Sequence, residues 1–195
     1  MAAQPTVGII ALQGDCGLHA LAFRRAGARV RFIRLPEELA GVQALTIPGG
    51  ESTTMTLLGY ENGLWPAVNE VAQAGTAVLG TCAGIIMLAT ELREENSGVV
   101  PLKLLDIAVA RNAYGSQVDS FEATVRLQLA AEPSEVPGVF IRAPAIVSVD
   151  APTQAVGWLD GQPVMARKDK VLGLTFHPEV TGDLTIHRYF LSLLG

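Results

Sequence analysis

The sequence carries little charge for its length. Only 17% of its 195 residues are Asp, Glu, Lys or Arg, whereas 49% are hydrophobic. Such a chain is expected to cover most of its elements on both faces, which favours a sheet enclosed between helix layers. The net charge is −5 and the basic residues are scattered, so nothing indicates a nucleic-acid-binding surface.

Cysteines and long apolar runs are also scarce. Cys16 and Cys82 lie far apart in the sequence and do not form the pattern of a disulfide framework or a zinc site. No apolar run reaches the roughly 18 residues of a membrane span, and the first residues lack the pattern of a secretory signal. We therefore expect a cytoplasmic protein with no membrane partner and no metal, in which a reactive thiol stays reduced.

The first half of the chain alternates short apolar runs with helical patterns. Strands are predicted at residues 7–12, 29–35, 44–47 and 76–79, the second of them at a sheet edge because it alternates basic and apolar residues. Helical segments are predicted at 19–26, 36–39, 52–58, 64–74 and from 85 onward. This alternation predicts a parallel sheet with right-handed crossovers.

The second half contains strand patterns without long helices between them. The predicted strands are 106–111, 120–128, 139–142, 146–149, 155–159, 163–167 and 171–176, and a final amphipathic helix covers about 183–194. The fold class is therefore α/β: three layers, with a mostly parallel central sheet flanked by helices and antiparallel strand additions in the second half. The length suits one domain spanning residues 1–195.

One cysteine stands at the junction of a predicted strand and a predicted helix, in Gly80-Thr81-Cys82-Ala83-Gly84. Small residues around a nucleophile at such a sharp turn are typical of a nucleophile elbow, and a helix N-terminus favours a thiolate. A buried structural cysteine at a strand–turn–helix junction would have the same local pattern. The motif therefore needs support from the rest of the chain.

A histidine follows the last predicted strand, in Phe176-His177-Pro178-Glu179. Cys82 and His177 are both expected at carboxyl ends of strands, where active sites of parallel sheets lie. A histidine there can act as base and acid, and Glu179 can orient it. The alternative is that both side chains are solvated in a surface loop.

A third stretch, Pro48-Gly49-Gly50-Glu51-Ser52-Thr53, follows the predicted strand 44–47. Its glycine N–H groups can face an oxyanion, and Ser52 or Thr53 can cap the following helix. A plain strand-to-helix turn is the alternative. The stretch lacks the Gly-Lys-Ser/Thr ending of a phosphate-binding loop.

Together the three stretches resemble the class I, triad-type glutamine amidotransferases. A closer resemblance is to the glutaminase subunits of pyridoxal 5'-phosphate synthase, and it spans nearly the whole chain. It rests on the three stretches above and on Leu12-Gln13-Gly14, residues 111–122 (RNAYGSQVDSFE) and Phe140-Ile141-Arg142-Ala143-Pro144. The last two stretches separate this subfamily from other glutamine amidotransferases. Its members often have a histidine after Arg-Ala-Pro, whereas this chain has Ala145.

The resemblance implies a role for each matching residue. Cys82 would be the nucleophile, His177 the base and acid, and Glu179 the residue that orients His177. L-glutamine would be bound by Gly50, Glu51, Ser52, Arg111, Ile141 and Arg142. The oxyanion would be held by Gly49, Gly50 and Ala83, and the contact with the synthase subunit would involve Gln13 and Gly14.

The resemblance also implies the reaction. Glutamine would be hydrolysed through a glutamyl thioester to glutamate and ammonia, and the ammonia would pass to the synthase subunit that makes pyridoxal 5'-phosphate (vitamin B6). No cofactor is implied for this chain. Two alternatives remain: a cysteine hydrolase or chaperone of the DJ-1/PfpI type, and a catalytically silent docking subunit. Cys16 either lies near the site or, as we favour, is a small buried hydrophobe.

Overall fold

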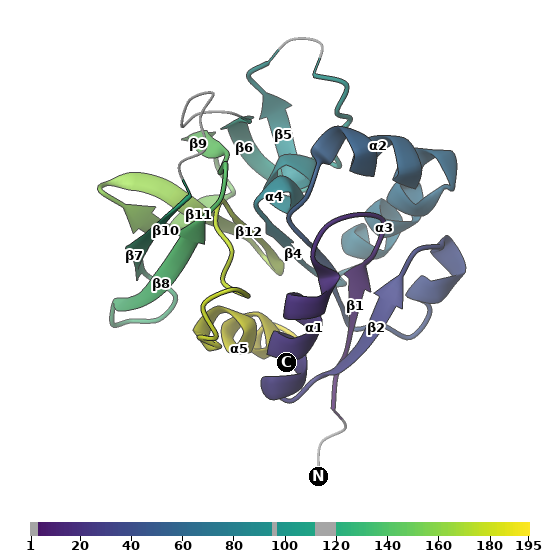
Figure 1. Ribbon diagram of the computed structural model, residues 1–195, viewed down its shortest axis with the longest axis horizontal. Coiled ribbons are helices and arrows are strands. Elements are labelled where there is room, and N and C mark those ends of the chain that lie inside the picture. Colours follow the sequence, from purple (N-terminus) through teal and green to yellow (C-terminus); the bar gives the residue numbers. More distant parts are fainter. Residues whose placement is uncertain (1–3, 95–96, 112–119) are drawn as a thin grey trace.

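The computed structural model describes residues 4–94, 97–111 and 120–195 (Figure 1). Residues 112–119, which carry part of the resemblance, lie outside the described residues. Five parallel strands form one half of a nine-stranded sheet, in the spatial order β2-β1-β3-β4-β12. They are β1 (Thr6–Ile10), β2 (Arg29–Ile33), β3 (Ala44–Ile47), β4 (Ala77–Thr81) and β12 (Val171–Leu174). The predicted edge position of residues 29–35 is confirmed, since β2 ends the sheet.

Four antiparallel strands continue the same sheet beyond β12, in the order β11-β10-β7-β8. They are β7 (Phe121–Leu127), β8 (Ser134–Phe140), β10 (Gln154–Leu159) and β11 (Gln162–Lys168). The turn between β10 and β11 has positive φ at Asp160 (49°) and Gly161 (80°), the conformation of a tight hairpin. We call these four strands the antiparallel wing.

Helices cover both faces of the parallel half. They are α1 (Cys16–Arg25), α2 (Ser52–Glu61), α3 (Leu64–Gln73), α4 (Ala83–Leu88) and α5 (Thr185–Ser192), with a 3-10 turn η1 (Pro36–Leu39). Figure 1 shows α1 and α5 on one side of the sheet and α2 and α3 on the other.

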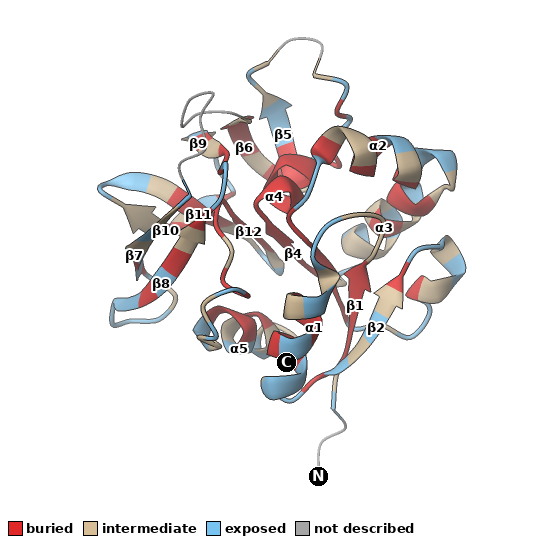
Figure 2. Ribbon diagram, viewed as in Figure 1, coloured by how far each residue is buried: buried red, intermediate tan, exposed pale blue. Residues whose placement is uncertain are grey.

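Alternate residues of one strand show how these layers are built. Val78 of β4 packs in the core that contains Trp65 of α3, whereas the next residue, Leu79, packs with Phe23 of α1 and Phe190 of α5. Successive side chains of a strand point to opposite faces, so both faces of β4 are buried (Figure 2). The predicted three-layer α/β class is therefore confirmed.

A second, three-stranded sheet was not predicted as a separate sheet, although two of its strands were predicted at residues 106–111 and 146–149. It consists of β5 (Ala89–Leu92), β6 (Leu105–Ala110) and β9 (Ala145–Val149). Residues 85–89 were expected to be the start of a longer helix. Instead, α4 ends at Leu88 and β5 begins at Ala89. Apolar residues of this small sheet join the core under α2 and α3, which explains why a strand can follow so directly.

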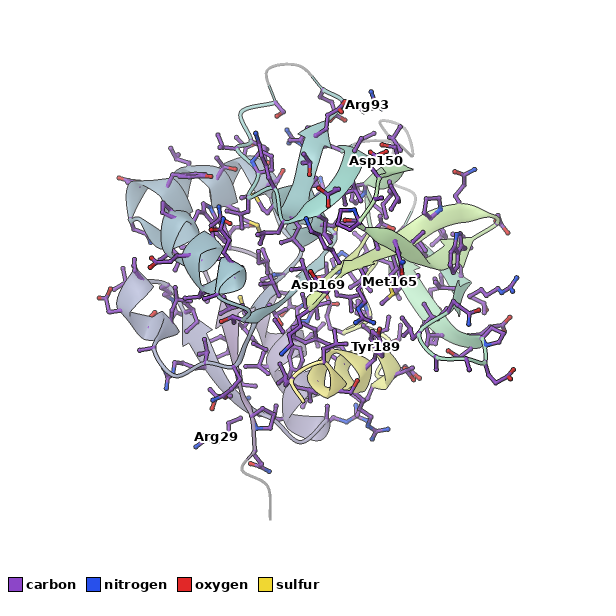
Figure 3. All side chains as sticks on the ribbon, turned by 180° about the vertical axis from the view of Figure 1, so that it is seen from behind. Arg29, Arg93, Asp150, Met165, Asp169 and Tyr189 are labelled. Atoms are coloured by element: carbon purple, nitrogen blue, oxygen red, sulfur yellow. The ribbon has the colours of Figure 1, made fainter. Side chains whose placement is uncertain are left out.

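Figure 3 shows the molecule from behind, where side chains fill the space between the sheet and α5. Met165 of β11 is fully buried there, and Tyr189 of α5 packs against the same core. Arg167 donates a 2.5 Å hydrogen bond to the Tyr189 hydroxyl. No helix in the described part of the chain is long and apolar enough to cross a membrane.

Candidate active site

Cys82 lies immediately after β4 in a backbone conformation that is rare for a residue with a side chain. Its φ is 51° and its ψ is −108°, and its N–H donates a 2.9 Å hydrogen bond to the Leu174 carbonyl of the neighbouring strand β12. Such strain persists only where the surrounding structure enforces it, and it is typical of nucleophile positions. The predicted elbow is therefore formed, with Cys82 at the carboxyl edge of the parallel strands.

The glycines of the elbow serve close packing around the turn. A Cβ on Gly84 would lie 2.1 Å from the Ile47 carbonyl oxygen of β3, and one on Gly80 would lie 2.7 Å from the backbone of Gly84. Both contacts involve backbone atoms, which cannot move aside cheaply. Only glycine lets α4 approach β3 and β4 so closely that Cys82 is held at the turn.

His177 lies after β12 and is oriented by Glu179. Its Nδ1 is 2.7 Å from Oε1 of Glu179, and its backbone N–H donates a 2.8 Å hydrogen bond to the Val139 carbonyl of β8. Burial alone lowers the pKa of His177, but hydrogen bonds with Cys82 and Glu179 outweigh it and raise the pKa to about 10. The contact with the Glu179 carboxylate thus favours the imidazolium form of His177.

Glu179 is almost fully buried, with 7% of its surface exposed. Burial alone raises its pKa, but the adjacent His19 and the hydrogen bond with His177 lower it more, so the net shift is downward. A carboxylate is thus retained next to the imidazolium, as an orienting group requires. The predicted alternative of solvated loop side chains is excluded by this burial.

Gly49 comes within contact distance of both Cys82 and His177. A Cβ on this residue would lie 2.4 Å from Cε1 of His177 and 3.2 Å from Cβ of Cys82. The loop after β3 therefore packs directly against the Cys82–His177 pair. It is in the right place to direct backbone N–H groups toward an oxyanion that forms at the sulfur.

A cavity of about 400 Å³ opens at this point, within the range of small-molecule sites. All the residues predicted for catalysis, substrate binding, the oxyanion and the partner contact line it. They are Gln13, Gly14, Gly49, Gly50, Glu51, Ser52, Cys82, Ala83, Arg111, Ile141, Arg142, His177 and Glu179, joined by Asp15, Ile86 and Pro144.

The rim of this cavity is held by Gln13 and Glu51. The Glu51 N–H donates a 2.6 Å hydrogen bond to Oε1 of Gln13, and Gly14 packs against the carbonyl of Gly49. The expectation that Ser52 or Thr53 caps α2 is wrong, because the Glu51 carboxylate accepts from the N–H groups of Thr53 and Thr54. Burial alone raises the pKa of Glu51, but these hydrogen bonds lower it to about 2.

The two predicted arginines differ in what they contact. Arg111 donates to the Ser97 carbonyl at 2.9 Å and lies 3.6 Å from Oε1 of Glu51. Arg142, by contrast, has no hydrogen bond or ion pair within the described ranges 4–94, 97–111 and 120–195. Its backbone φ of 43° is unusual, and its side chain lines the cavity. Arg142 is thus the arginine available to an anionic ligand group.

Sequence reasoning missed His19, which is buried behind the triad. Its Nε2 lies 3.0 Å from Oγ1 of Thr81 and 3.4 Å from Oε1 of Glu179. Nothing local marks His19, because it sits in a helix pattern among small and apolar residues. The contact joins opposite ends of the chain and becomes visible only in the folded protein.

Cys16 lies outside the cavity lining. It lines a neighbouring hollow that shares Gln13, Gly14 and Asp15 with the cavity, and its Sγ donates a 3.4 Å hydrogen bond to the Ile10 carbonyl. Burial, followed by the charge of Asp15, raises its pKa against a smaller lowering by Arg34. Cys16 is thus half-buried and lies beside the cavity, as the alternative interpretation expected, and its role as a small buried hydrophobe stays a prediction. Among the described side chains, no cluster of three or more His, Cys, Asp or Glu could hold a metal ion.

Solved structures define the class to which this fold and site belong. The chain matches the crystal structure of a glutamine amidotransferase with a TM-score of 0.89 and 41% identity, over 97% of this chain and 98% of that one. PurLQS from Thermotoga maritima matches with a TM-score of 0.76 over 98% of both chains, at 14% identity, which shows the shared fold alone. The fold with its elbow cysteine is thus that of the class I glutamine amidotransferases.

The chain belongs to the SNO glutamine amidotransferase family, whose pattern matches residues 9–194. It is 45% identical to pyridoxal 5'-phosphate synthase subunit PdxT of Thermococcus kodakarensis, over 95% of this chain and 96% of that protein. It is 46% identical to the subunit PdxT of Chloroflexus aurantiacus, over 96% of this chain and all of that protein. The resemblance inferred from the motifs is therefore confirmed.

Proposed function

We propose that this chain hydrolyses L-glutamine to L-glutamate and ammonia and delivers the ammonia to a partner synthase subunit that makes pyridoxal 5'-phosphate. The observation that carries the proposal is the strained Cys82 elbow facing a buried His177–Glu179 pair in one cavity. Relatives about 45% identical over nearly the whole chain are PdxT subunits of that synthase. We further propose that residues 1–195 act as a single amidotransferase domain.

Substrate binding divides between charged and backbone groups. Arg142 binds the α-carboxylate of glutamine, since its guanidinium is without a partner in the described part of the chain. Arg111 and Glu51 form one wall, and Ile141 covers the methylene groups of the substrate. Backbone groups of Gly50 and Ser52 complete the site, because the Glu51 carboxylate is already engaged in capping α2.

The first chemical step forms a bond between Sγ of Cys82 and the side-chain amide carbon of glutamine. The carbonyl electron pair moves to oxygen, and N–H groups of Gly49, Gly50 and Ala83 stabilise the oxyanion. His177 then gives its Nε2 proton to the amide nitrogen, the C–N bond breaks, and ammonia leaves a glutamyl thioester on Cys82.

The second step is hydrolysis of that thioester. The neutral His177 takes a proton from water, whose oxygen attacks the thioester carbon, and the collapse of the new oxyanion releases glutamate and the Cys82 thiolate. Glu179 keeps the ring of His177 in place and stabilises its charged form in both steps. The ionic state of His177 at neutral pH matches the start of the cycle.

The contact with the synthase subunit involves Gln13 and Gly14 at the cavity rim. These two residues also line the hollow beside the site and touch the loop that carries Gly49. A partner that docks here therefore sits next to both the ammonia source and the oxyanion loop. The complex is a hetero-oligomer in the cytoplasm, and neither nucleic acid nor a membrane takes part.

The alternatives have less support. Family membership does not favour a cysteine hydrolase or chaperone of the DJ-1/PfpI type. A silent docking subunit would not need a buried carboxylate beside an imidazolium in a ligand-sized cavity.

Ammonia release from glutamine tests the proposal, measured with and without the PdxS-type synthase subunit. Wild-type chain in the complex is expected to release ammonia, and Cys82→Ala to release none. A glutamine-like electrophile is expected to label the peptide with Cys82 and leave the peptide with Cys16 unlabelled. Ammonia release by the Cys82→Ala complex, or no adduct on Cys82 in the wild-type complex, would reject the proposal.

A further inference from the structure

A chain of buried polar side chains extends from the triad into the layer between the sheet and helices α1 and α5. His19 of α1 is 0% exposed, and it lies next to Thr81 of β4 and Glu179 of the loop after β12. On its other side is His187 of α5, with ring centroids 5.8 Å apart. Two histidines are thus buried to the same extent, and one of them touches the triad.

The neighbours of His19 decide where its proton lies. Nδ1 of His19 has no hydrogen-bond partner among the residues that the structure describes, whereas Nε2 faces the oxygens of Thr81 and Glu179. A proton on Nδ1 would leave a buried donor unpaired, at a cost close to that of a lost hydrogen bond. The Nε2–H tautomer is therefore favoured. Its N–H donates to Oγ1 of Thr81 at 3.0 Å and lies against Oε1 of Glu179, with Nε2 3.4 Å from that oxygen.

Burial also determines the charge of this group. Burial lowers the pKa of His19 against the opposing effect of the Glu179 charge, with a further lowering by His177, and this shift favours the neutral ring. A neutral donor can hold the Glu179 carboxylate without adding a second positive charge that would replace His177 as its partner. Oε2 of Glu179 has no partner in the described part of the chain, whereas Oε1 is hydrogen-bonded to His177 at 2.7 Å and lies 3.4 Å from Nε2 of His19.

We propose that His19 is a positioning residue for glutamine hydrolysis: its Nε2–H holds Oε1 of Glu179 so that the carboxylate stays aligned with Nδ1 of His177. The proposal rests on the proposed glutaminase function. A glutamate side chain can adopt several staggered rotamers, and a buried donor from α1 restricts that freedom. His19 acts through Glu179 and does not touch the substrate.

His187 provides a matched control. It is also 0% exposed, it lies edge-on to Phe23 at 4.9 Å, and both its ring nitrogens lack partners among the described residues. Substitution of His187 by Leu therefore disturbs the same core without removing a contact to the triad. Any loss that His19→Leu shows beyond His187→Leu belongs to the contacts of His19 with Glu179 and Thr81. The double-mutant cycle with Glu179→Gln separates these two contacts.

Steady-state ammonia release by the complex with the synthase subunit provides the test. His19→Leu is expected to lower kcat by about 10- to 100-fold, the rate equivalent of one hydrogen bond to a charged group, with KM changed by less than about twofold. His19→Gln, whose amide N–H reaches the position of Nε2, is expected to recover most of kcat. His187→Leu is expected to keep kcat within about twofold of wild type.

A double-mutant cycle separates positioning from mere packing. If His19 acts through Glu179, His19→Leu causes no further fall of kcat in a Glu179→Gln background, whereas a packing effect would be the same in both backgrounds. Where His19→Leu does not fold, His19→Asn takes its place in the cycle, because its shorter amide does not reach the position of Nε2. A thermal unfolding midpoint equal to that of wild type confirms that each variant in the comparison is folded.

The pH profile supplies a second readout. Glu179 is faced by His19 from α1 and by His177, while His19 is also near Asp15 and, from α5, His187. Loss of the donor raises the pKa of Glu179, so the acidic limb of kcat moves to higher pH in His19→Leu and returns in His19→Gln. A purely structural role would lower the profile without moving it.

The outcomes are distinguishable from failure of the proposed function. An inactive wild-type complex would reject the glutaminase function itself. An active wild type with His19→Leu at its full kcat, an equal loss in His187→Leu, or an additive double-mutant cycle would reject the role of His19 and leave the glutaminase function standing.

Discussion

The carboxyl edge of the parallel strands and the antiparallel wing both contribute to the cavity, in different ways. The parallel edge supplies Cys82, His177, Glu179 and Gly49. Cys82 has a strained backbone, Glu179 is buried, and Gly49 packs so closely against His177 that no Cβ would fit between them. The wing supplies Ile141 and Arg142, which follow β8 and are exposed. The groups proposed to react are thus rigidly held, and those proposed to bind substrate are accessible.

This difference suggests a division of labour that follows from the fold. Parallel strands end together at one edge, so their loops converge and lock one another. An antiparallel strand pair ends in open loops, which leaves side chains free for a ligand. We therefore expect changes at the parallel edge to affect kcat, and changes in the wing to affect KM.

Gly49→Ala is expected to have the largest effect. The new Cβ would lie 2.4 Å from Cε1 of His177, so it would displace the ring and remove general acid–base catalysis, with a fall of kcat of roughly 10²- to 10⁴-fold. Gly17→Ala in α1 is the control, since its Cβ would meet only Oδ1 of Asp15 at 3.4 Å. Ammonia release by Gly49→Ala near the wild-type rate would contradict the close packing of Gly49 against His177 at the parallel edge.

The second expected effect concerns stability and pH. The pKa of His177 is raised from the unfolded value of about 6.5 to about 10, so its stabilising charge is fully present below pH 6.5 and is lost as the pH rises through 10. Wild type is therefore expected to lose about 1.5–3 kcal/mol more than His177→Gln across this window, the value of a hydrogen bond between charged groups.

Urea unfolding of both proteins at pH 6 and pH 10.5 measures this difference. Titrating groups that do not contact His177, including Cys16 and Tyr60 with their raised pKa values, are common to both proteins and cancel in the comparison. Equal losses in wild type and His177→Gln would mean that no charged pair is built into the parallel edge.

Arg142→Ala tests the wing, with a smaller expected effect. Loss of one charged hydrogen-bond donor to the substrate is expected to raise KM by about 10-fold and to leave kcat within about twofold. Arg126→Ala is the control, because Arg126 is an exposed arginine of the same wing that is not part of the cavity lining. A fall of kcat with unchanged KM would show that the wing acts on the chemistry after all.

Cys16→Ala is expected to have the smallest effect. Its Sγ makes weak hydrogen bonds to the carbonyls of Ile10 and Gly14, and its pKa is raised by burial, so it is not an activated nucleophile. Ammonia release is expected to stay within about twofold of wild type. A fall in ammonia release comparable to that of Gly49→Ala would show that Cys16 takes part in the reaction and belongs with the groups of the parallel edge.

Most of the parallel half could be predicted from the sequence. The strand Ala44–Ile47 was predicted to the residue, because a short apolar run between breakers leaves no other choice. Strands β6 and β9 were predicted to within one residue, but β5 and the separate sheet that it forms with them were missed. Ala89 continues the apolar pattern of α4, and nothing local marks the change to a strand. The pairing with β6 in the folded protein makes residues 89–92 a strand.

The site shows the same limit. The sequence separation of two residues places Glu179 beside His177, so the pair was predictable from the motif. Capping of α2 by Glu51 was not, since Ser52 and Thr53 have equal or better intrinsic preference for that position. The loop from β3 holds Glu51 outward through Gln13, a contact between remote segments.

The sequence by itself determined the alternation of strands and helices, the elbow at Cys82 and the pairing of His177 with Glu179. Each depends on residues that are neighbours in the chain, whose local preferences are strong enough to act alone. Only the tertiary structure decided that Arg142 from the wing lies across the cavity and that His19 lies behind Glu179. Such contacts join distant segments, and their geometry comes from how the layers pack.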